Sequence, residues 1–204
     1  MILQLDKLVP GDMIIMLVSS NLFKKSSKSR KVRCEICANY CKIADGAYGI
    51  CKQHKNINGE LFDESFGIVS SLNADPIEKK PLYHFLPGTL TYSVGGFGCN
   101  MGCLHCQNYM IPKEFDKISD RLNILPETIV ENAISQGCKS IAWTYNEPTI
   151  HLPFNKKTSL LGRRKNLKII YVSNGYMSSQ ALSEILEFVD AFNIDLKSMQ
   201  LTYN

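Results

Sequence analysis

The chain has 204 residues, of which 45% are hydrophobic and 21% charged, the composition of a globular protein with one core and a small appendage. A net charge of +4 is too weak to indicate a nucleic-acid partner, and the basic run at 23–33 is interpreted as a solvated linker. No segment reaches the about 20 apolar residues of a membrane span, and an acidic residue precedes the apolar run at 13–18, which argues against a secretory signal. We therefore expect a cytoplasmic protein without a membrane partner, whose eight cysteines indicate metal binding rather than disulfides.

The first half of the chain is predicted to be poor in regular structure. Residues 1–33 are expected to form an N-terminal extension with a loosely ordered basic linker. Residues 34–60 are rich in cysteine and glycine and are expected to form a small knuckle held by a metal. Residues 61–89 end in DPIEKKPLYHFLPG, where prolines and a glycine indicate loops, so they are interpreted as a connecting segment. Within it, Lys79 and Lys80 are interpreted as surface charges.

The knuckle carries four cysteines in CEICANYCKIADGAYGIC. Four thiols can close a tetrahedral site, and a closed site is typical of structural zinc. A fully ligated iron–sulfur cluster is the alternative and would suit electron transfer. His54, close to the last of these cysteines, is a weaker candidate ligand. The four predicted ligands are Cys34, Cys37, Cys41 and Cys51.

From Leu90 onward, strand patterns alternate with helix patterns. In the predicted helix at 125–137, Pro126 suits the first turn and Gly137 suits the end. In the predicted helix at 178–190, four apolar residues are expected to share one face, namely Leu182, Ile185, Leu186 and Val189. The predicted strands are 90–94, 140–145, 167–175 and 191–197. This alternation predicts parallel β/α units, with functional residues at the carboxyl ends of the strands.

The strand ends carry the polar motifs of this half. GCNMGCLHCQN follows the first strand, and NEPT, SNGY and DLK follow the next three. Three cysteines in one loop can ligate three irons of a cubane cluster and leave the fourth iron open to an exchangeable ligand. Those cysteines are Cys99, Cys103 and Cys106. Cys138 and Trp143 are interpreted as core residues.

A cysteine triplet of the form CxxxCxxC after a strand, within a β/α chain, resembles the radical SAM superfamily. The combination with YNEPT, SNGY and DLK is similar to the branch related to pyruvate formate-lyase activating enzyme. Together with the upstream cysteines and DPIEKKPLYHFLPG, it resembles the AmmeMemoRadiSam system radical SAM enzyme over about residues 34–200.

The resemblance implies the chemistry. Cys99, Cys103 and Cys106 would ligate a [4Fe-4S] cluster, and S-adenosylmethionine would chelate its open iron. Reductive cleavage would give methionine and a 5′-deoxyadenosyl radical, which abstracts hydrogen from an unknown substrate. A low-potential electron donor of the flavodoxin or ferredoxin type is then an expected partner.

Other motif residues acquire expected roles beside this cofactor. Glu147 is expected to bind the ammonium of the methionine moiety, and Asn174 the ribose hydroxyls. Asp195 and Lys197 alternate on one strand, so both should point to one side and contact the ribose or the carboxylate. His105 falls where the family often places an aromatic residue beside the adenine.

The expected fold is α/β: a partial (β/α) barrel of radical SAM type, with a small N-terminal cysteine-rich metal-binding segment. About four of the usual six units are recognised within residues 90–204, so the core is expected to be incomplete. The open edge predicts low stability, or an obligate protein partner or missing C-terminal half. The segment at 151–166, where the family would place a helix, has poor apolar spacing for one.

Other functions remain open on the sequence alone. One is a glycyl-radical enzyme activase, whose substrate is a protein backbone. Another is a non-catalytic zinc or iron–sulfur module that binds RNA or protein, or an inactive fragment. A third is a ferredoxin-like electron carrier, which would require four cysteines where the loop at 99–106 has three.

Overall fold

The structure is a computed structural model that describes residues 16–113 and 122–199. The start of the predicted N-terminal extension, residues 1–15, and the end of the predicted core, residues 200–204, lie outside the described residues. Among the described residues, no helix combines the length and the apolar character that crossing a membrane requires.

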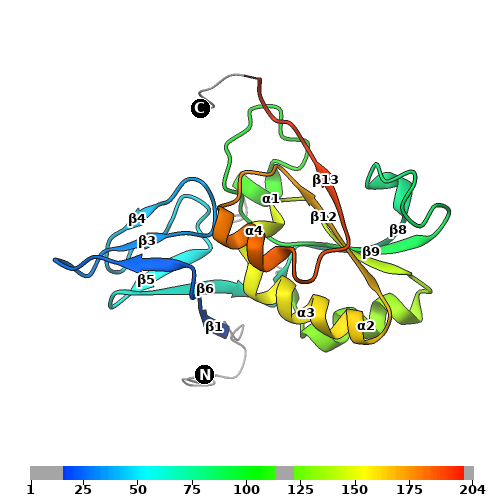
Figure 1. Cartoon of the computed structure of the whole chain (residues 1–204), viewed down its shortest axis with the longest axis horizontal. Helices are drawn as coiled ribbons and strands as arrows, with labels where there is room; N and C mark the ends of the chain where they lie inside the picture. The colour runs from blue at the N-terminus through cyan, green and yellow to red at the C-terminus, as the bar shows by residue number, and fades with distance from the viewer. Residues whose placement is uncertain (1–15, 114–121, 200–204) are drawn as a thin grey trace.

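A five-stranded sheet in the order β13-β12-β11-β9-β8 forms the centre of the molecule (Figure 1). Strands β9, β11, β12 and β13 run parallel, as the alternation of elements predicted, and β8 pairs antiparallel with β9 at one edge. The bounds are β8 Ser71–Pro76, β9 Leu90–Gly95, β11 Ser140–Trp143, β12 Lys168–Ser173 and β13 Ala191–Ile194.

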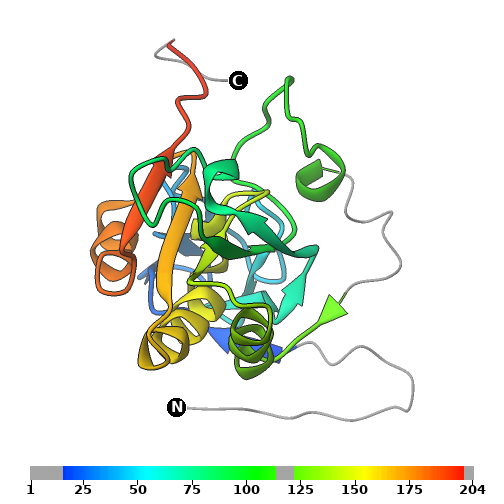
Figure 2. The ribbon, with the colours of Figure 1, turned by 90° about the vertical axis from the view of Figure 1, so that its right-hand side faces the viewer.

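Three helices cover one face of this sheet, and α2 and α3 run side by side along it (Figures 1 and 2). Side chains of the helices and of β9, β11 and β12 form the main core, which includes Cys138 and Trp143, both buried as predicted. The bounds are α2 Pro126–Ser135, α3 Leu152–Arg164 and α4 Ser179–Ile185. Pro126 stands in the first turn of α2, and Gly137 follows its end with a φ of +71°, which favours glycine.

The opposite face of the sheet is partly covered by the segment after β8. Ile77, at the start of the 3₁₀ helix η1 (Ile77–Lys79), is fully buried with Ala142 and Ile170, against Leu82 and Phe85. Residues 61–89, interpreted as a connecting segment, also supply the edge strand β8 and a cover for the sheet. The sequence SLNADP did not indicate this strand, and its burial does not alternate, with Asp75 as its one buried residue.

The N-terminal strands form a lobe beside the α/β core, on the left in Figure 1. They make two antiparallel three-stranded sheets, β1-β6-β5 and β2-β3-β4, and β7 pairs with β10. The bounds are β1 Met16–Ser19, β2 Phe23–Lys25, β3 Val32–Cys34, β4 Lys42–Ile43, β5 His54–Ile57, β6 Glu60–Phe66, β7 Ile68–Val69 and β10 Leu122–Asn123. Residues 23–33, expected to be a solvated and loosely ordered linker, instead lie in the hairpin of β2 and β3, whose tip is exposed. A small apolar cluster around Val32, Ile43 and Leu61 supports the lobe.

Helix α3 forms where apolar spacing argued against a helix. Its buried side is largely small or polar, and includes Asn155, Thr158, Ser159 and Gly162. Trp143 Nε1 donates to Ser159 Oγ at 2.9 Å, and a Cβ at Gly162 would lie 3.2 Å from Ile141 Cδ1. The helix therefore packs by close approach and hydrogen bonding, which an apolar pattern does not reveal.

The predicted face of the helix at 178–190 is also wrong. Ile185 is fully buried, but Leu182 and Leu186 are 38% and 59% exposed. The buried residues are instead Ala181, Ile185 and Phe188. The helix ends at Ile185, so helical periodicity cannot be extended to Leu186 and Val189.

We predict that Phe188→Ala lowers the free energy of unfolding by about 3–5 kcal/mol, because the buried ring packs edge-on against Tyr171. The matched control is Leu186→Ala, at an exposed position two residues away, which should change it by less than about 0.5 kcal/mol. Urea unfolding followed by circular dichroism measures both. Equal losses would contradict the packing described here.

Candidate active site

The loop with the three cysteines follows β9 and leads into the short helix α1 (Met110–Lys113). It borders a cavity of about 510 Å³ at the carboxyl ends of the parallel strands, within the size range of ligand pockets. Lys113 Nζ donates to the carbonyl oxygens of Gly102 and Cys103 at 3.2 and 2.6 Å, which ties the loop to α1.

The residues that the sequence analysis assigned to the iron–sulfur cluster and to S-adenosylmethionine all line the same cavity in the structure. They come from the loop after β9 and from the ends of β11, β12 and β13. The lining includes Cys99, Cys103, Cys106, His105, Glu147, Asn174, Asp195 and Lys197. Cys103 is buried, Cys99 and Cys106 are half-buried, and His105 is exposed.

The three thiols form a donor set that suits a metal cluster. Burial raises the pKa of Cys99 to about 11, with further contributions from Glu147, Cys103 and Cys106. The chain by itself therefore disfavours a thiolate at Cys99, and the positive charge of bound iron would supply the missing stabilisation. Across residues 16–113 and 122–199, no three Cys, His, Asp or Glu side chains are arranged to hold an ion.

Two glycines before Cys99 are required by close contacts. A Cβ at Gly96 would lie 2.4 Å from Nε2 of His151. A Cβ at Gly98 would lie 2.5 Å from the carbonyl oxygen of Cys51, and Gly98 has a φ of +78°. The motif GGFGC therefore lets the loop that carries Cys99 pack directly against the upstream cysteine segment and against His151.

We predict that Gly98→Ala lowers the free energy of unfolding by about 3 kcal/mol, because the methyl group meets backbone and the φ is unfavourable for alanine. Gly102→Ala is the control within the same loop, since no atom lies within 4 Å of its added Cβ. Thermal unfolding of the metal-free protein compares them. Equal unfolding temperatures for Gly98→Ala and Gly102→Ala would show that the contact between Gly98 and Cys51 does not constrain the fold.

Glu147 is buried and already satisfied by the chain. Its Oε1 accepts hydrogen bonds from the backbone N–H and hydroxyl of Thr149, and its Oε2 from the N–H of Asn174, while Ser173 Oγ lies within 3.1 Å of both oxygens. Burial raises its pKa, and these hydrogen bonds oppose the shift. Glu147 therefore joins the ends of β11 and β12, and an ammonium group would have to displace one of these donors.

Asn174 and Asn100 connect three segments around the cavity. Asn174 Nδ2 donates to Asn100 Oδ1 at 2.8 Å, and Asn100 Nδ2 donates to the carbonyl of Tyr176 at 3.0 Å. Asn39, between two upstream cysteines, donates to the carbonyl of Asn100 at 2.7 Å. Asn174 thus orients the loop beside Cys99, in addition to lining the cavity.

Asp195 and Lys197 lie just beyond β13 and contact each other, with Lys197 Nζ 2.9 Å from Asp195 Oδ2. The strand predicted at 191–197 ends at Ile194, so the two residues do not alternate along it, and their side chains are brought together by the ion pair. The pKa of Lys197 is raised by Asp195, although burial opposes the shift. The cavity therefore has a charged pair at this strand end.

The sequence analysis missed a group of polar side chains at the cavity, formed by Asp75, Lys80 and Tyr145. Lys80 was interpreted as a surface charge, but it is 4% exposed and pairs with Asp75 at 3.1 Å, while Lys79 is exposed and also contacts Asp75. Tyr145 donates to the same carboxylate at 3.1 Å. Its donors hold the pKa of Asp75 far below its usual value, although burial opposes the shift. Asp75 lies in β8, whereas Lys79 ends η1 and Lys80 caps it, so no helical or strand periodicity in the sequence marked the group.

The upstream cysteines share one region of the N-terminal lobe. Burial raises the pKa of Cys34 far above its ordinary value and that of Cys51 to about 12, and the neighbouring upstream thiols raise both further. Cys51 Sγ lies 3.5 Å from Nδ1 of His54. The backbone of Cys37 forms an isolated antiparallel β-bridge with the backbone of Met177, next to the loop that holds Asn174. The two cysteine sets, about 50 residues apart in sequence, are therefore neighbours in the fold.

His151 is a second buried group that the sequence analysis did not consider. It lies at the end of the 3₁₀ helix η3 (Pro148–His151), directly behind the NEPT motif. Nε2 lies 2.8 Å from the carbonyl oxygen of Phe97, and Nδ1 lies 2.8 Å from Ser65 Oγ. Burial lowers its pKa to about 4, so the ring is neutral at pH 7.

The lowered pKa of His151 predicts acid sensitivity. The unfolded chain binds a proton at this histidine below about pH 6.5, whereas the folded chain does so only near pH 4, so stability falls as pH drops through this window. The loss should reach about 3 kcal/mol, and His151→Gln should remove it. The control is His84→Gln, at an exposed position. Urea unfolding at pH 7.5, 6 and 4.5 measures the effect. An unchanged pH dependence in His151→Gln would contradict it.

A model of the Radical SAM superfamily matches residues 93–203 of this chain. The chain belongs to this superfamily, whose members generally use an iron–sulfur cluster to cleave S-adenosylmethionine reductively. It is 43% identical over 178 residues to an uncharacterized protein of Methanocaldococcus jannaschii, MJ0808; the match covers 86% of this chain and 52% of that protein. The chain thus spans about half the length of this relative. The crystal structure of QueE from Escherichia coli matches 57% of this chain and 66% of its own, with 15% identity and a TM-score of 0.40.

Proposed function

We propose that Cys99, Cys103 and Cys106 hold a [4Fe-4S] cluster, and that the adjoining cavity binds S-adenosylmethionine. The observation that carries the proposal is the convergence of the cysteine loop and three further strand ends on one cavity of about 510 Å³. With three thiols in the loop, one iron of such a cluster has no cysteine ligand. When bound, the cluster supplies the electron that splits the sulfonium of S-adenosylmethionine.

The residues of the chain act by binding and orientation. Lys197 is a cation at the cavity that can pair with the methionine carboxylate, and Asp195 offers an acceptor to the ribose hydroxyls. Glu147 holds the ends of β11 and β12 together. His105 lies on the loop and can flank the adenine. These roles follow from position and chemistry.

We place the chain, within the superfamily, with the AmmeMemoRadiSam system enzymes. Support comes from the motif set and from the upstream cysteine segment, which packs directly on the cluster loop through Gly98 and Asn100. The substrate and a low-potential electron donor are then external partners. We also propose that the parallel sheet forms the wall of a partial barrel, because Ile194 and Leu196, at the edge strand β13, are 53% and 75% exposed.

We further propose that Cys34, Cys37, Cys41 and Cys51 hold a closed, structural metal site, with zinc as the simplest occupant. Support comes from the number of thiols and from their shared environment in the small lobe. Such a site would fix the segment that contacts Gly98 and Asn100. A second iron–sulfur cluster at this position is the alternative outcome of metal analysis.

We predict that Cys103→Ser abolishes formation of 5′-deoxyadenosine from S-adenosylmethionine and dithionite after anaerobic reconstitution, because one iron loses its ligand. Cys138→Ser is the control, since this thiol is buried in the core away from the cavity. Cys37→Ser should lower the zinc content and the yield of soluble protein. Chromatography of the nucleoside product and metal analysis by mass spectrometry provide the measurements.

Comparing Cys103→Ser with Cys37→Ser distinguishes the proposed cluster site from the proposed structural metal site. Full product formation by Cys103→Ser would reject the proposed function. Identical metal loss and activity loss in Cys37→Ser and Cys103→Ser would reject the division into an open catalytic site and a closed structural site.

A further inference from the structure

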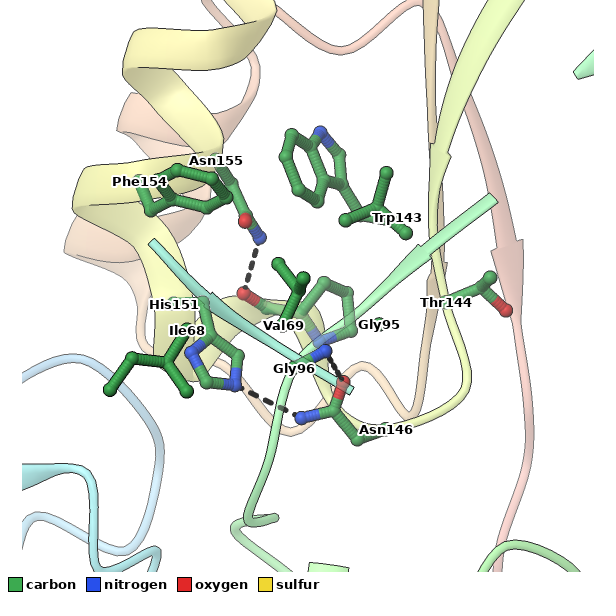
Figure 3. Close-up of a pocket in the computed structure, with 12 residues that line it drawn as sticks. Ile68, Val69, Gly95, Gly96, Trp143, Thr144, Asn146, His151, Phe154 and Asn155 are labelled. Carbon is green, nitrogen blue, oxygen red and sulfur yellow. Dashed lines mark hydrogen bonds between the residues drawn. The ribbon is translucent and has the colours of Figure 1, made fainter. Parts of the chain in front are cut away.

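His151 joins the cluster loop to the N-terminal lobe through buried hydrogen bonds. The side chain is 4% exposed and lies among residues of β7, β9 and α3, with Ser65 of β6 against its Nδ1. Figure 3 shows the imidazole beside Asn146 and close to Gly96, where the absence of a side chain makes room for the ring. No role in the proposed chemistry has yet been given to this histidine.

The hydrogen-bond partners define the tautomer of His151. The carbonyl oxygen of Phe97 can only accept, so Nε2, at 2.8 Å, carries the hydrogen. Nδ1 lies 2.8 Å from the hydroxyl of Ser65, whose single hydrogen is shared between this nitrogen and Asp63 Oδ1. Asn146 Nδ2 lies 3.0 Å from Nε2, but its two hydrogens are taken by the carbonyls of Phe97 and Gly98 at 3.2 and 2.9 Å.

These contacts fix the peptide that precedes Cys99. The carbonyl of Phe97 is held by His151 and Asn146, and the N–H of Gly98, in the same peptide unit, donates to the carbonyl of Ile111 at 3.2 Å. Both ends of this peptide are therefore held while Gly98 adopts a positive φ. The direction in which the chain leaves Gly98 sets the direction of the Cys99 side chain.

Ser65 connects His151 to strand β6. Its hydroxyl lies 2.5 Å from Asp63 Oδ1, and its backbone N–H donates to the same oxygen at 2.7 Å. An Asp–Ser–His group also occurs in hydrolytic sites, but Ser65 is 3% exposed and the adjoining void is only about 10 Å³. That space holds about one water molecule, so no substrate can reach the hydroxyl.

We propose that His151 is a positioning residue for the cluster loop: its Nε2–H holds the Phe97 carbonyl, while its Nδ1 contacts Ser65 of the N-terminal lobe. The inference rests on the proposed function, because the loop it orients is the one assigned to the cluster. Groups around a metal site that orient the ligands are typically essential to its properties.

Amide hydrogen exchange in the metal-free protein, followed by NMR, tests the proposal without the cofactor. His151→Phe keeps the ring volume and removes both nitrogens, and it should accelerate exchange of the Gly96 and Gly98 amides at least about tenfold. His151→Gln keeps an N–H near the position of Nε2 and should stay within about threefold of the unsubstituted protein.

Asn155→Leu is the matched control, because Asn155 is 2% exposed and lines the same void but bonds to Pro148 and Tyr171 instead of the loop. It should lower the unfolding midpoint and leave exchange at Gly96 and Gly98 unchanged. Equal acceleration by His151→Phe and Asn155→Leu, or equal acceleration by His151→Phe and His151→Gln, would overturn the proposal.

The tautomer is measured on the unsubstituted protein, which requires no variant to fold. Long-range ¹H–¹⁵N spectra should show the Nε2–H form for the histidine whose signal is lost in His151→Gln, and an Nδ1–H form would overturn the proposal. In reconstituted protein, His151→Phe should change the electron paramagnetic resonance spectrum of the reduced cluster and Asn155→Leu should not. If the unsubstituted protein binds no cluster, the proposed function fails, whereas the exchange and tautomer results still decide the role of His151.

Discussion

The contact between the backbone at Gly98 and the carbonyl oxygen of Cys51 is the constraint on which the rest of the site depends. A single added carbon at Gly98 would lie 2.5 Å from that oxygen. This contact places the upstream cysteine segment directly behind the loop that carries Cys99. The N-terminal lobe is therefore a structural support for the loop that carries Cys99, and the two cysteine sets belong to one continuous region of the molecule.

The hydrogen bonds around the cavity follow from the same close approach. Asn100, next to Cys99, receives a hydrogen bond from Asn39 in the lobe and another from Asn174 at the end of β12. Glu147 and His151 flank the short 3₁₀ helix after β11 and face different neighbours: Glu147 braces β12, and His151 holds the carbonyl of Phe97. Buried polar groups of this kind are stable only when each has a partner, so their arrangement strongly limits the conformations of the loop.

The cavity is lined by charged side chains that come from several elements. Lys80 and Asp75 form a buried pair on the side where β8 and η1 cover the sheet, and Tyr145 lies across them. The backbone carbonyl of Lys80 accepts a hydrogen bond from Asn193 Nδ2 of β13 at 3.0 Å, so this segment is tied to the strand that precedes the Asp195–Lys197 pair. Lys80 and the Asp195–Lys197 pair thus line one cavity, in a chain of the Radical SAM superfamily, whose members generally use a substrate and a reductant.

The sequence by itself determined the features that are local. Helix and strand periodicity predicted the parallel β/α order. The polar motifs that follow three of the strands predicted that Glu147, Asn174 and Asp195 lie at one cavity, because the carboxyl ends of parallel strands meet at one edge of the sheet. Only the tertiary structure decided which groups face one another across long sequence separations: Gly98 against Cys51, His151 against Ser65, and Lys80 against Tyr145. It also decided that α3 is a helix with a polar buried side, since small residues and hydrogen bonds, which leave no apolar pattern, hold it to the sheet.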